Sequence, residues 1–78
     1  MRKNLIPPMD LVAKALNISV DQLNEQSAYG KTLNWDSLNH LDVIRELETN
    51  YNIQIPDSEI ENYSTMKEII KLFEELNG

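Results

Sequence analysis

The stretch that decides the fold is residues 35–51, which read WDSLNHLDVIRELETNY. Asp36 is a preferred N-cap residue, and apolar side chains recur after it at helical spacing. They are Leu38, Leu41, Val43, Ile44, Leu47 and Tyr51. A helix of about 15 residues at this place would be roughly 22 Å long. The pattern predicts an amphipathic helix that begins after Asp36 and ends near Asn50 and Asn52.

Helical patterns also occupy both flanks of this stretch. Pro8 suits the first position of a helix, and the apolar residues that follow predict a first helix up to Asn17. Pro56 begins a short helix through residues 57–60, and a capping box at residues 65–68 opens a last helix. The apolar residues of that last helix are Met66, Ile69, Ile70, Phe73 and Leu76. We therefore expect an all-α fold, a small antiparallel helical bundle of three main helices and one short one.

The connections between these helices differ in length. A long loop, residues 18–36, joins the first and second helices, and its apolar residues suggest that it is pinned onto the core. They are Ile18, Leu23, Tyr29, Leu33 and Trp35. Ser19 to Gln22 resembles a capping box and predicts one short helical turn within the loop. Residues 53–55 alternate like a strand, but without a partner strand we expect an extended connector.

Composition limits the classes of function. The chain has 78 residues, no Cys, 41% hydrophobic residues and a net charge of −6. We expect one domain over residues 1–78, with one core but no deep substrate pocket, which argues against a self-sufficient enzyme. The acidic balance argues against nucleic acid as a partner. Leu5-Ile6 stops at Pro7-Pro8, too short for a signal peptide or membrane span, so we expect a cytoplasmic protein without a membrane partner. A bundle of this size with a polar exterior should be a monomer.

The residue that could carry chemistry is Ser37. The chain has no Cys, a single His, and neither a Gly-rich phosphate loop nor a calcium loop. Ser37 falls on the first turn of the predicted central helix, where free N–H groups and the helix dipole favour an anion, such as a phosphodiester on Oγ. The alternative is that Asp36 and Ser37 are simply competing N-cap residues.

A miniature hydrolase is a second alternative, because Ser37, His40 and Asp42 could be mistaken for a catalytic triad. Positions 40 and 42 project about 200° apart on a helix, so Asp42 is poorly placed to orient His40. We expect His40 to be exposed and to add positive charge to the central helix as the pH falls.

Longer motifs favour one family. The run Trp35 to Leu38, the apolar helix to Tyr51, Ile55-Pro56-Asp57 and Ser64-Thr65-Met66 together resemble the acyl carrier protein family, from Ile18 onward. The resemblance implies that Ser37 receives 4′-phosphopantetheine covalently from coenzyme A, through a separate phosphopantetheinyl transferase that uses magnesium. It also implies that the arm's thiol holds acyl or aminoacyl groups as thioesters for acyl-loading and acyl-processing enzymes, and that the carrier is no enzyme. The alternative is a non-covalent helical adaptor with unmodified Ser37.

The same resemblance suggests a docking face for partner enzymes. It implies that Asp36, Asp42 and Glu48 meet basic patches of partners, with Leu38 as an apolar contact and Arg45 as a positive charge in their midst. The chain departs from the family pattern at Asn39 and Thr49, where acids are common, and at Trp35. Trp35, Asn39 and Arg45 together suggest a discrete carrier of a specialised lipid, secondary metabolite or saccharide pathway. The alternative is that these residues form only the solvated side of an amphipathic helix.

Overall fold

A computed structural model describes residues 5–77, which form three α-helices and two short 3-10 helices. In chain order they are α1 (Pro8–Leu16), η1 (Val20–Gln22), α2 (Ser37–Tyr51), η2 (Asp57–Tyr63) and α3 (Met66–Asn77). Residues 5–77 contain no strand and one isolated bridge, between Ala28 and Thr65. The predicted all-α fold, with a long loop between the first two main helices, is confirmed.

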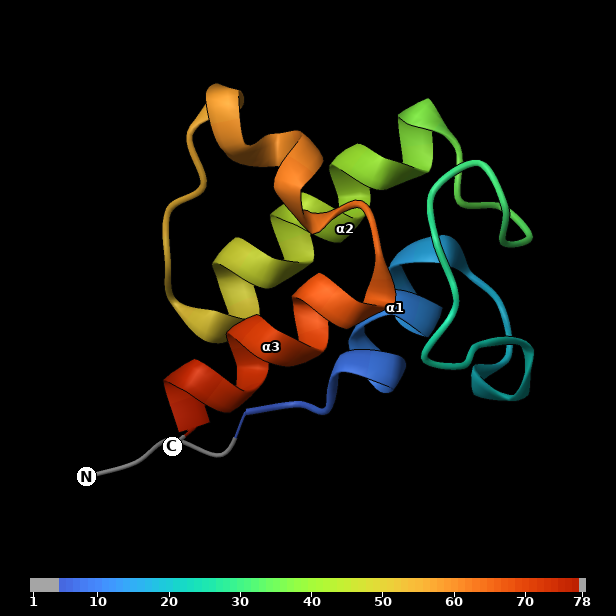
Figure 1. Cartoon of the computed structure of the whole chain (residues 1–78), viewed down its shortest axis with the longest axis horizontal. Coiled ribbons are helices and arrows are strands. Elements are labelled where there is room, and N and C mark those ends of the chain that lie inside the picture. The colour runs from blue at the N-terminus through green and yellow to red at the C-terminus, as the bar shows by residue number, and fades with distance from the viewer. Residues whose placement is uncertain (1–4, 78) are drawn as a thin grey trace.

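The three main helices pack side by side (Figure 1). α2 and α3 cross the view in the same direction, and α1 runs back against them. α1 packs against both of the others. Helix η2 lies beside the first half of α2. The loop of residues 18–36 lies at the end of the bundle where α2 begins. The start of α2 is therefore bordered by the loop and by η2.

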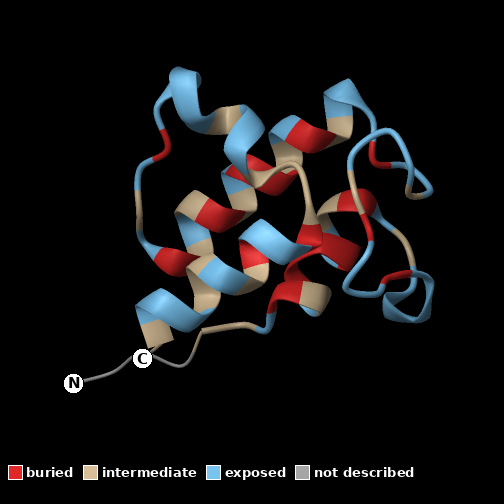
Figure 2. Cartoon of the chain, in the orientation of Figure 1, coloured by how far each residue is buried: buried red, intermediate tan, exposed pale blue. Residues whose placement is uncertain are grey.

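The core lies where α1, α2 and α3 face one another (Figure 2). Each of these helices contributes two or more side chains that are almost fully shielded, and the loop contributes one large aromatic ring. The largest are Trp35, Leu11, Leu16, Leu47, Met66, Ile69, Val12 and Val43. Fully burying one such side chain stabilises the fold by about 1.5–3 kcal/mol. By contrast, η2 contributes no buried residue.

Asparagines end the first two helices. Asn17 and Asn52 adopt left-handed backbone conformations, with φ of 58° and 57°, and their N–H groups bond to carbonyls of the preceding turn. Asn tolerates this conformation better than most residues, which suits it to helix ends. The predicted boundaries of α1 and α2 are confirmed, and the local side chains account for them.

The loop between α1 and α2 is anchored by fewer side chains than predicted. Leu23 and Trp35 are buried, whereas Tyr29 is exposed and Leu33 is 56% exposed, so the prediction that these last two pin the loop is wrong. The capping box predicted at Ser19 is present and opens η1.

Hydrogen bonds also anchor the loop: the Asn34 side-chain amide donates to Leu16 O of α1 over 3.1 Å, and two backbone bonds reach the C-terminal third. The Tyr29 N–H donates to Ser64 O over 2.8 Å, and the Met66 N–H donates to Ser27 O over 2.9 Å. These bonds join the loop to the junction of η2 and α3. Because backbone groups make them, no pattern of apolar side chains could have predicted them.

The C-terminal third follows the predicted order with altered limits. Residues 53–55 form the extended connector, η2 continues to Tyr63 rather than Ile60, and Thr65 Oγ1 accepts the Glu68 N–H over 3.3 Å. Leu76 is exposed, so it does not belong to the buried face of α3 as predicted.

Tyr51 provides a test of this packing. Its hydroxyl donates to Ile6 O over 2.9 Å, its ring lies against Phe73, and burial raises the pKa of Tyr51 from 10.0 to about 12. The raised pKa means that the stabilisation is complete below pH 10 and is lost as the pH rises through about 12. We expect Tyr51→Phe to cost about 1 kcal/mol at neutral pH and to weaken the alkaline loss of stability. Urea unfolding across this pH range measures both effects, and Tyr29→Phe, on an exposed ring, is the matched control.

Candidate functional site

Ser37 is the first residue of α2, and its side chain is exposed. The N-cap is Asp36: its Oδ1 accepts the Asn39 N–H over 3.0 Å, and its carbonyl accepts the His40 N–H over 2.8 Å. The two residues therefore do not compete for the cap. Asp36 closes the helix end, and the Ser37 hydroxyl is left at the surface.

The surroundings of this hydroxyl suit an anion. The N–H groups of Ser37 and Leu38 stand in the first turn of α2, where no intrahelical carbonyl can accept them. Together with the aligned peptide dipoles of this 15-residue helix, they place partial positive charge at its start. A phosphodiester on Ser37 Oγ would be stabilised there, so the residues present fit a phosphate-linked group.

The chain is held firmly on its way into α2. Trp35 is only 1% exposed, its N–H donates to Thr32 O over 3.0 Å, and its carbonyl accepts the Gly30 N–H over 2.8 Å. Asn34 takes a left-handed conformation with φ of 64°, and its carbonyl accepts from the Asn39 side chain over 2.8 Å. Burial of Trp35 thus sets the position of the exposed Ser37 two residues later.

His40 is buried, and the prediction that it is exposed is wrong. It is 6% exposed, the Trp35 indole Nε1–H donates to His40 Nδ1 over 3.0 Å, and His40 Nε2 lies 3.0 Å from Ile60 O. Position 40 lies on the same helix face as Val43 and Leu47, which turns it toward the interior. The polar ring is tolerated there because both nitrogens have partners.

These contacts also argue against a catalytic triad of Ser37, His40 and Asp42. Both nitrogens of the His40 ring are engaged, so neither is directed at the Ser37 hydroxyl. Asp42 lies elsewhere on the helix and pairs with Arg45 at 3.5 Å. The structure does not bring the three side chains together as a nucleophile, a base and an orienting acid.

A groove of about 490 Å³ is lined by Ser37 and by residues of α2 and η2. Its lining mixes polar and apolar side chains from the loop, α2, η2 and the residue after η2. They are Tyr29, Ser37, His40, Leu41, Ile60, Glu61 and Ser64. The sequence predicts only Ser37 among these as a site residue. His40 and Leu41 follow it on α2, whereas the other four residues come from segments farther away in the chain.

The residues predicted for partner docking lie on α2, and the structure shows what each contacts. Leu38 is 77% exposed, and Asp36 is occupied as the N-cap. Asp42 and Arg45 form an exposed ion pair. Glu48 Oε2 accepts the Ile55 N–H over 2.9 Å, so its carboxylate also orients the connector that leads to η2.

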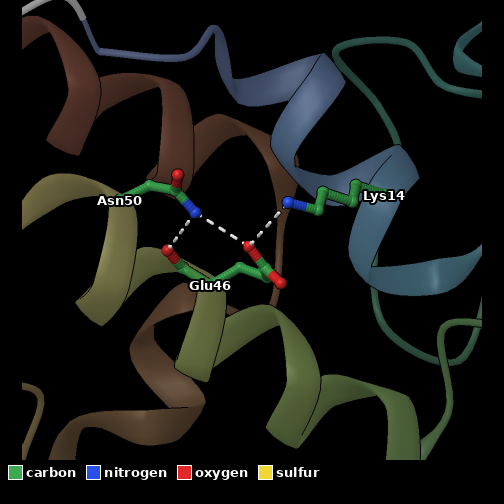
Figure 3. A network of polar contacts seen from close by, with 3 residues as sticks. All are labelled: Lys14, Glu46 and Asn50. Carbon is green, nitrogen blue, oxygen red and sulfur yellow. Dashed lines mark hydrogen bonds and ion pairs between the residues drawn. The ribbon is translucent and has the colours of Figure 1, made fainter.

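A further carboxylate of α2 contacts α1. Glu46 Oε1 accepts from Asn50 Nδ2 over 2.8 Å and lies 3.9 Å from Lys14 Nζ of α1 (Figure 3). The Asn50 amide also donates to Glu46 O over 3.0 Å. Since the Lys14 side chain is largely exposed, the ion pair contributes little stability, about 0–1 kcal/mol. Glu46 is thereby directed toward α1.

The part of the chain that the structure describes contains neither a metal-binding cluster nor a membrane-spanning helix. Residues 5–77 bring together no group of three or more His, Cys, Asp or Glu side chains able to hold a metal ion. None of the helices within those residues has the length and apolar character needed to cross a membrane.

Comparison with known proteins identifies the family. The family model described as "Phosphopantetheine attachment site" matches residues 9–73. The chain is 31% identical to the acyl carrier protein of Wolinella succinogenes over 65 residues, which cover 83% of this chain and 86% of that protein. It is 34% identical over 65 residues to that of Sulfurovum sp., covering 83% and 87%, and 33% identical over 61 residues to that of Chlorobium phaeobacteroides, covering 78% of each. With its helical bundle and a serine at the start of α2, the chain belongs to the acyl carrier protein family, whose members carry phosphopantetheine.

Proposed function

We propose that this chain is a single-domain carrier that holds acyl or aminoacyl groups as thioesters on a 4′-phosphopantetheine arm attached to Ser37. The observation that carries the proposal is the exposed Ser37 hydroxyl at the electropositive start of α2, with the cap role taken by Asp36. The family match over residues 9–73 supports the same group on this chain.

The attachment needs a separate enzyme. Ser37 Oγ forms a bond to phosphorus, the pyrophosphate bond of coenzyme A breaks, and the adenosine-bearing part leaves. The hydroxyl proton must pass to a base, and an unassisted serine hydroxyl is a weak nucleophile. Because the nitrogens of His40 are engaged with Trp35 and Ile60, we assign the base to a phosphopantetheinyl transferase. The same reasoning favours a carrier over a hydrolase.

Partner enzymes would dock on the face formed by Asp36, Leu38, Asp42, Arg45 and Glu48. Leu38 offers an apolar contact one residue from the arm. The three carboxylates each have a partner within the chain: Asn39 N, the Arg45 side chain and Ile55 N. These contacts leave less free negative charge for a basic partner surface, and Arg45 adds an exposed positive charge.

This charge pattern supports a carrier of a specialised lipid, secondary metabolite or saccharide pathway. A housekeeping fatty acid synthase, whose enzymes present basic patches to carriers, should extend the malonyl-loaded protein poorly. Elongation assays with reconstituted synthase enzymes test this assignment, and efficient elongation would contradict it.

Mass spectrometry tests the attachment itself. The purified protein, incubated with coenzyme A, magnesium and a promiscuous phosphopantetheinyl transferase, should gain the mass of one phosphopantetheine. Fragmentation should place that mass on Ser37. An unchanged mass, with a known carrier modified in the same tube, would favour a non-covalent adaptor instead.

A further inference from the structure

One imidazole ring joins three separate segments of the chain. His40 belongs to α2, its Nδ1 accepts from Trp35 of the loop, and its Nε2 contacts Ile60 O of η2, each over 3.0 Å. Within residues 5–77 the contact with Ile60 is the one hydrogen bond between α2 and η2. In the function proposed above, these contacts serve only to exclude His40 as the base for Ser37.

The partners of His40 leave it a single protonation state. An indole N–H can only donate and a carbonyl oxygen can only accept. His40 Nδ1 must therefore be unprotonated, where it faces Trp35, and Nε2 must carry the proton, where it faces Ile60. These partners assign the neutral tautomer, with hydrogen on Nε2.

A second proton on His40 cannot be accommodated in this arrangement. It would sit on Nδ1 and point at the Trp35 Nε1–H, so two donors would face each other across 3.0 Å. Rotating the ring by half a turn does not help, because it exchanges Nδ1 with Cδ2 and Nε2 with Cε1, so that ring carbons would face the indole N–H and Ile60 O. A buried donor that faces another donor loses its hydrogen bond without gaining water, so the charged ring must move.

The surroundings indicate which way it moves. Trp35 is held in the core and by its own backbone hydrogen bonds, whereas η2 contributes no buried residue. The groove beside Ser37 offers the ring a path toward solvent. The titratable groups facing it are Tyr29 of the loop, whose ring centroid is 5.6 Å from that of His40, and Glu61 of η2, with Asp36 one turn earlier on α2. An imidazolium in the groove would be favoured by the Glu61 carboxylate and by the face of the Tyr29 ring.

We propose that the Trp35–His40–Ile60 hydrogen-bond chain is a proton-sensitive latch that couples the loop before Ser37 to η2. With His40 neutral the latch is closed and η2 is held against α2. Protonation of His40 breaks its bond to Trp35, turns the ring into the groove and releases Ile60 O, so that η2 moves away from α2. The latch is a property of the unmodified chain and does not depend on attachment at Ser37.

NMR spectroscopy of the unmodified protein tests the latch directly. At about pH 8 the ring ¹⁵N shifts should identify an unprotonated Nδ1 and a protonated Nε2 on His40. On acidification, the indole N–H of Trp35 and the amides of Ile60 and Glu61 should shift together with the His40 ring. Trp35 is the only tryptophan, so its indole signal is unambiguous.

Variants separate the latch from the titration of nearby carboxylates. In His40→Gln, which cannot take up a proton, the shared step should vanish, whereas Glu61→Gln should retain it. Breaking the bond by Trp35→Phe should speed exchange of the η2 amides about fivefold at neutral pH. The latch is refuted if the ring titrates without movement of Trp35 or η2, if the other tautomer is found, or if the step persists in His40→Gln.

Discussion

Replacing Ser37 by alanine is expected to abolish phosphopantetheine incorporation completely. The substitution removes the oxygen that would bond to phosphorus, and no other residue of α2 places a hydroxyl in its first turn. Incubation with coenzyme A, magnesium and transferase, followed by mass spectrometry of the intact protein, measures the loss.

Ser64→Ala is the matched control, because Ser64 lines the same groove as Ser37. It should take up the group as the wild type does. The free energy of unfolding of Ser37→Ala should lie within about 0.5 kcal/mol of the wild-type value, since the residue is exposed and Asp36 provides the cap. Modification of Ser37→Ala would move the attachment site elsewhere and would overturn the proposed function.

Replacing Trp35 by alanine is expected to cost about 3–5 kcal/mol of the free energy of unfolding. The indole is among the largest fully buried side chains, and the only other buried apolar side chain of its loop is Leu23. Small domains are stable by only about 5–15 kcal/mol, so this loss is a large part of the total. Urea unfolding followed by circular dichroism measures it without relying on tryptophan fluorescence.

Leu33→Ala is the control for the Trp35 variant. Leu33 lies in the same loop, two residues earlier, but is 56% exposed, and its truncation should change stability by no more than about 0.5 kcal/mol. A small effect of Trp35→Ala, or equal effects of the two variants, would contradict the finding that Trp35 anchors the entry to α2.

Interactions between residues close together in the sequence set the helix boundaries and the buried helix faces. The sequence was therefore sufficient to predict these features. Asp36 caps α2, Asn17 and Asn52 end α1 and α2, and the helical spacing of apolar residues marks the buried faces. Capping and periodicity act over one to two turns, within the reach of a short stretch of chain. The position of Ser37 in the first turn of α2 follows from the same local signals.

The tertiary structure decided the features that depend on residues distant in the chain. The polar side chain of His40 predicts an exposed residue. The fold allows its burial, because it brings the carbonyl of Ile60, 20 positions later, within hydrogen-bonding distance of the ring. The sequence predicts Glu48 as a charge for partner docking, but the fold brings the connector to it, and Glu48 accepts a hydrogen bond from Ile55 N. Leu38 belongs by spacing to the apolar side of α2 yet stands exposed.

The physical reason for this division is the range of the interactions. A helix and its ends are set by hydrogen bonds between residues a few positions apart. The residue types that favour these bonds can therefore be recognised in a short stretch of sequence. The burial of a polar ring, the partner of a carboxylate and the lining of a groove depend on which surfaces the packed helices bring together. The sequence was therefore sufficient to identify the serine at the start of α2, and only the fold placed the Trp35–His40–Ile60 chain beside it.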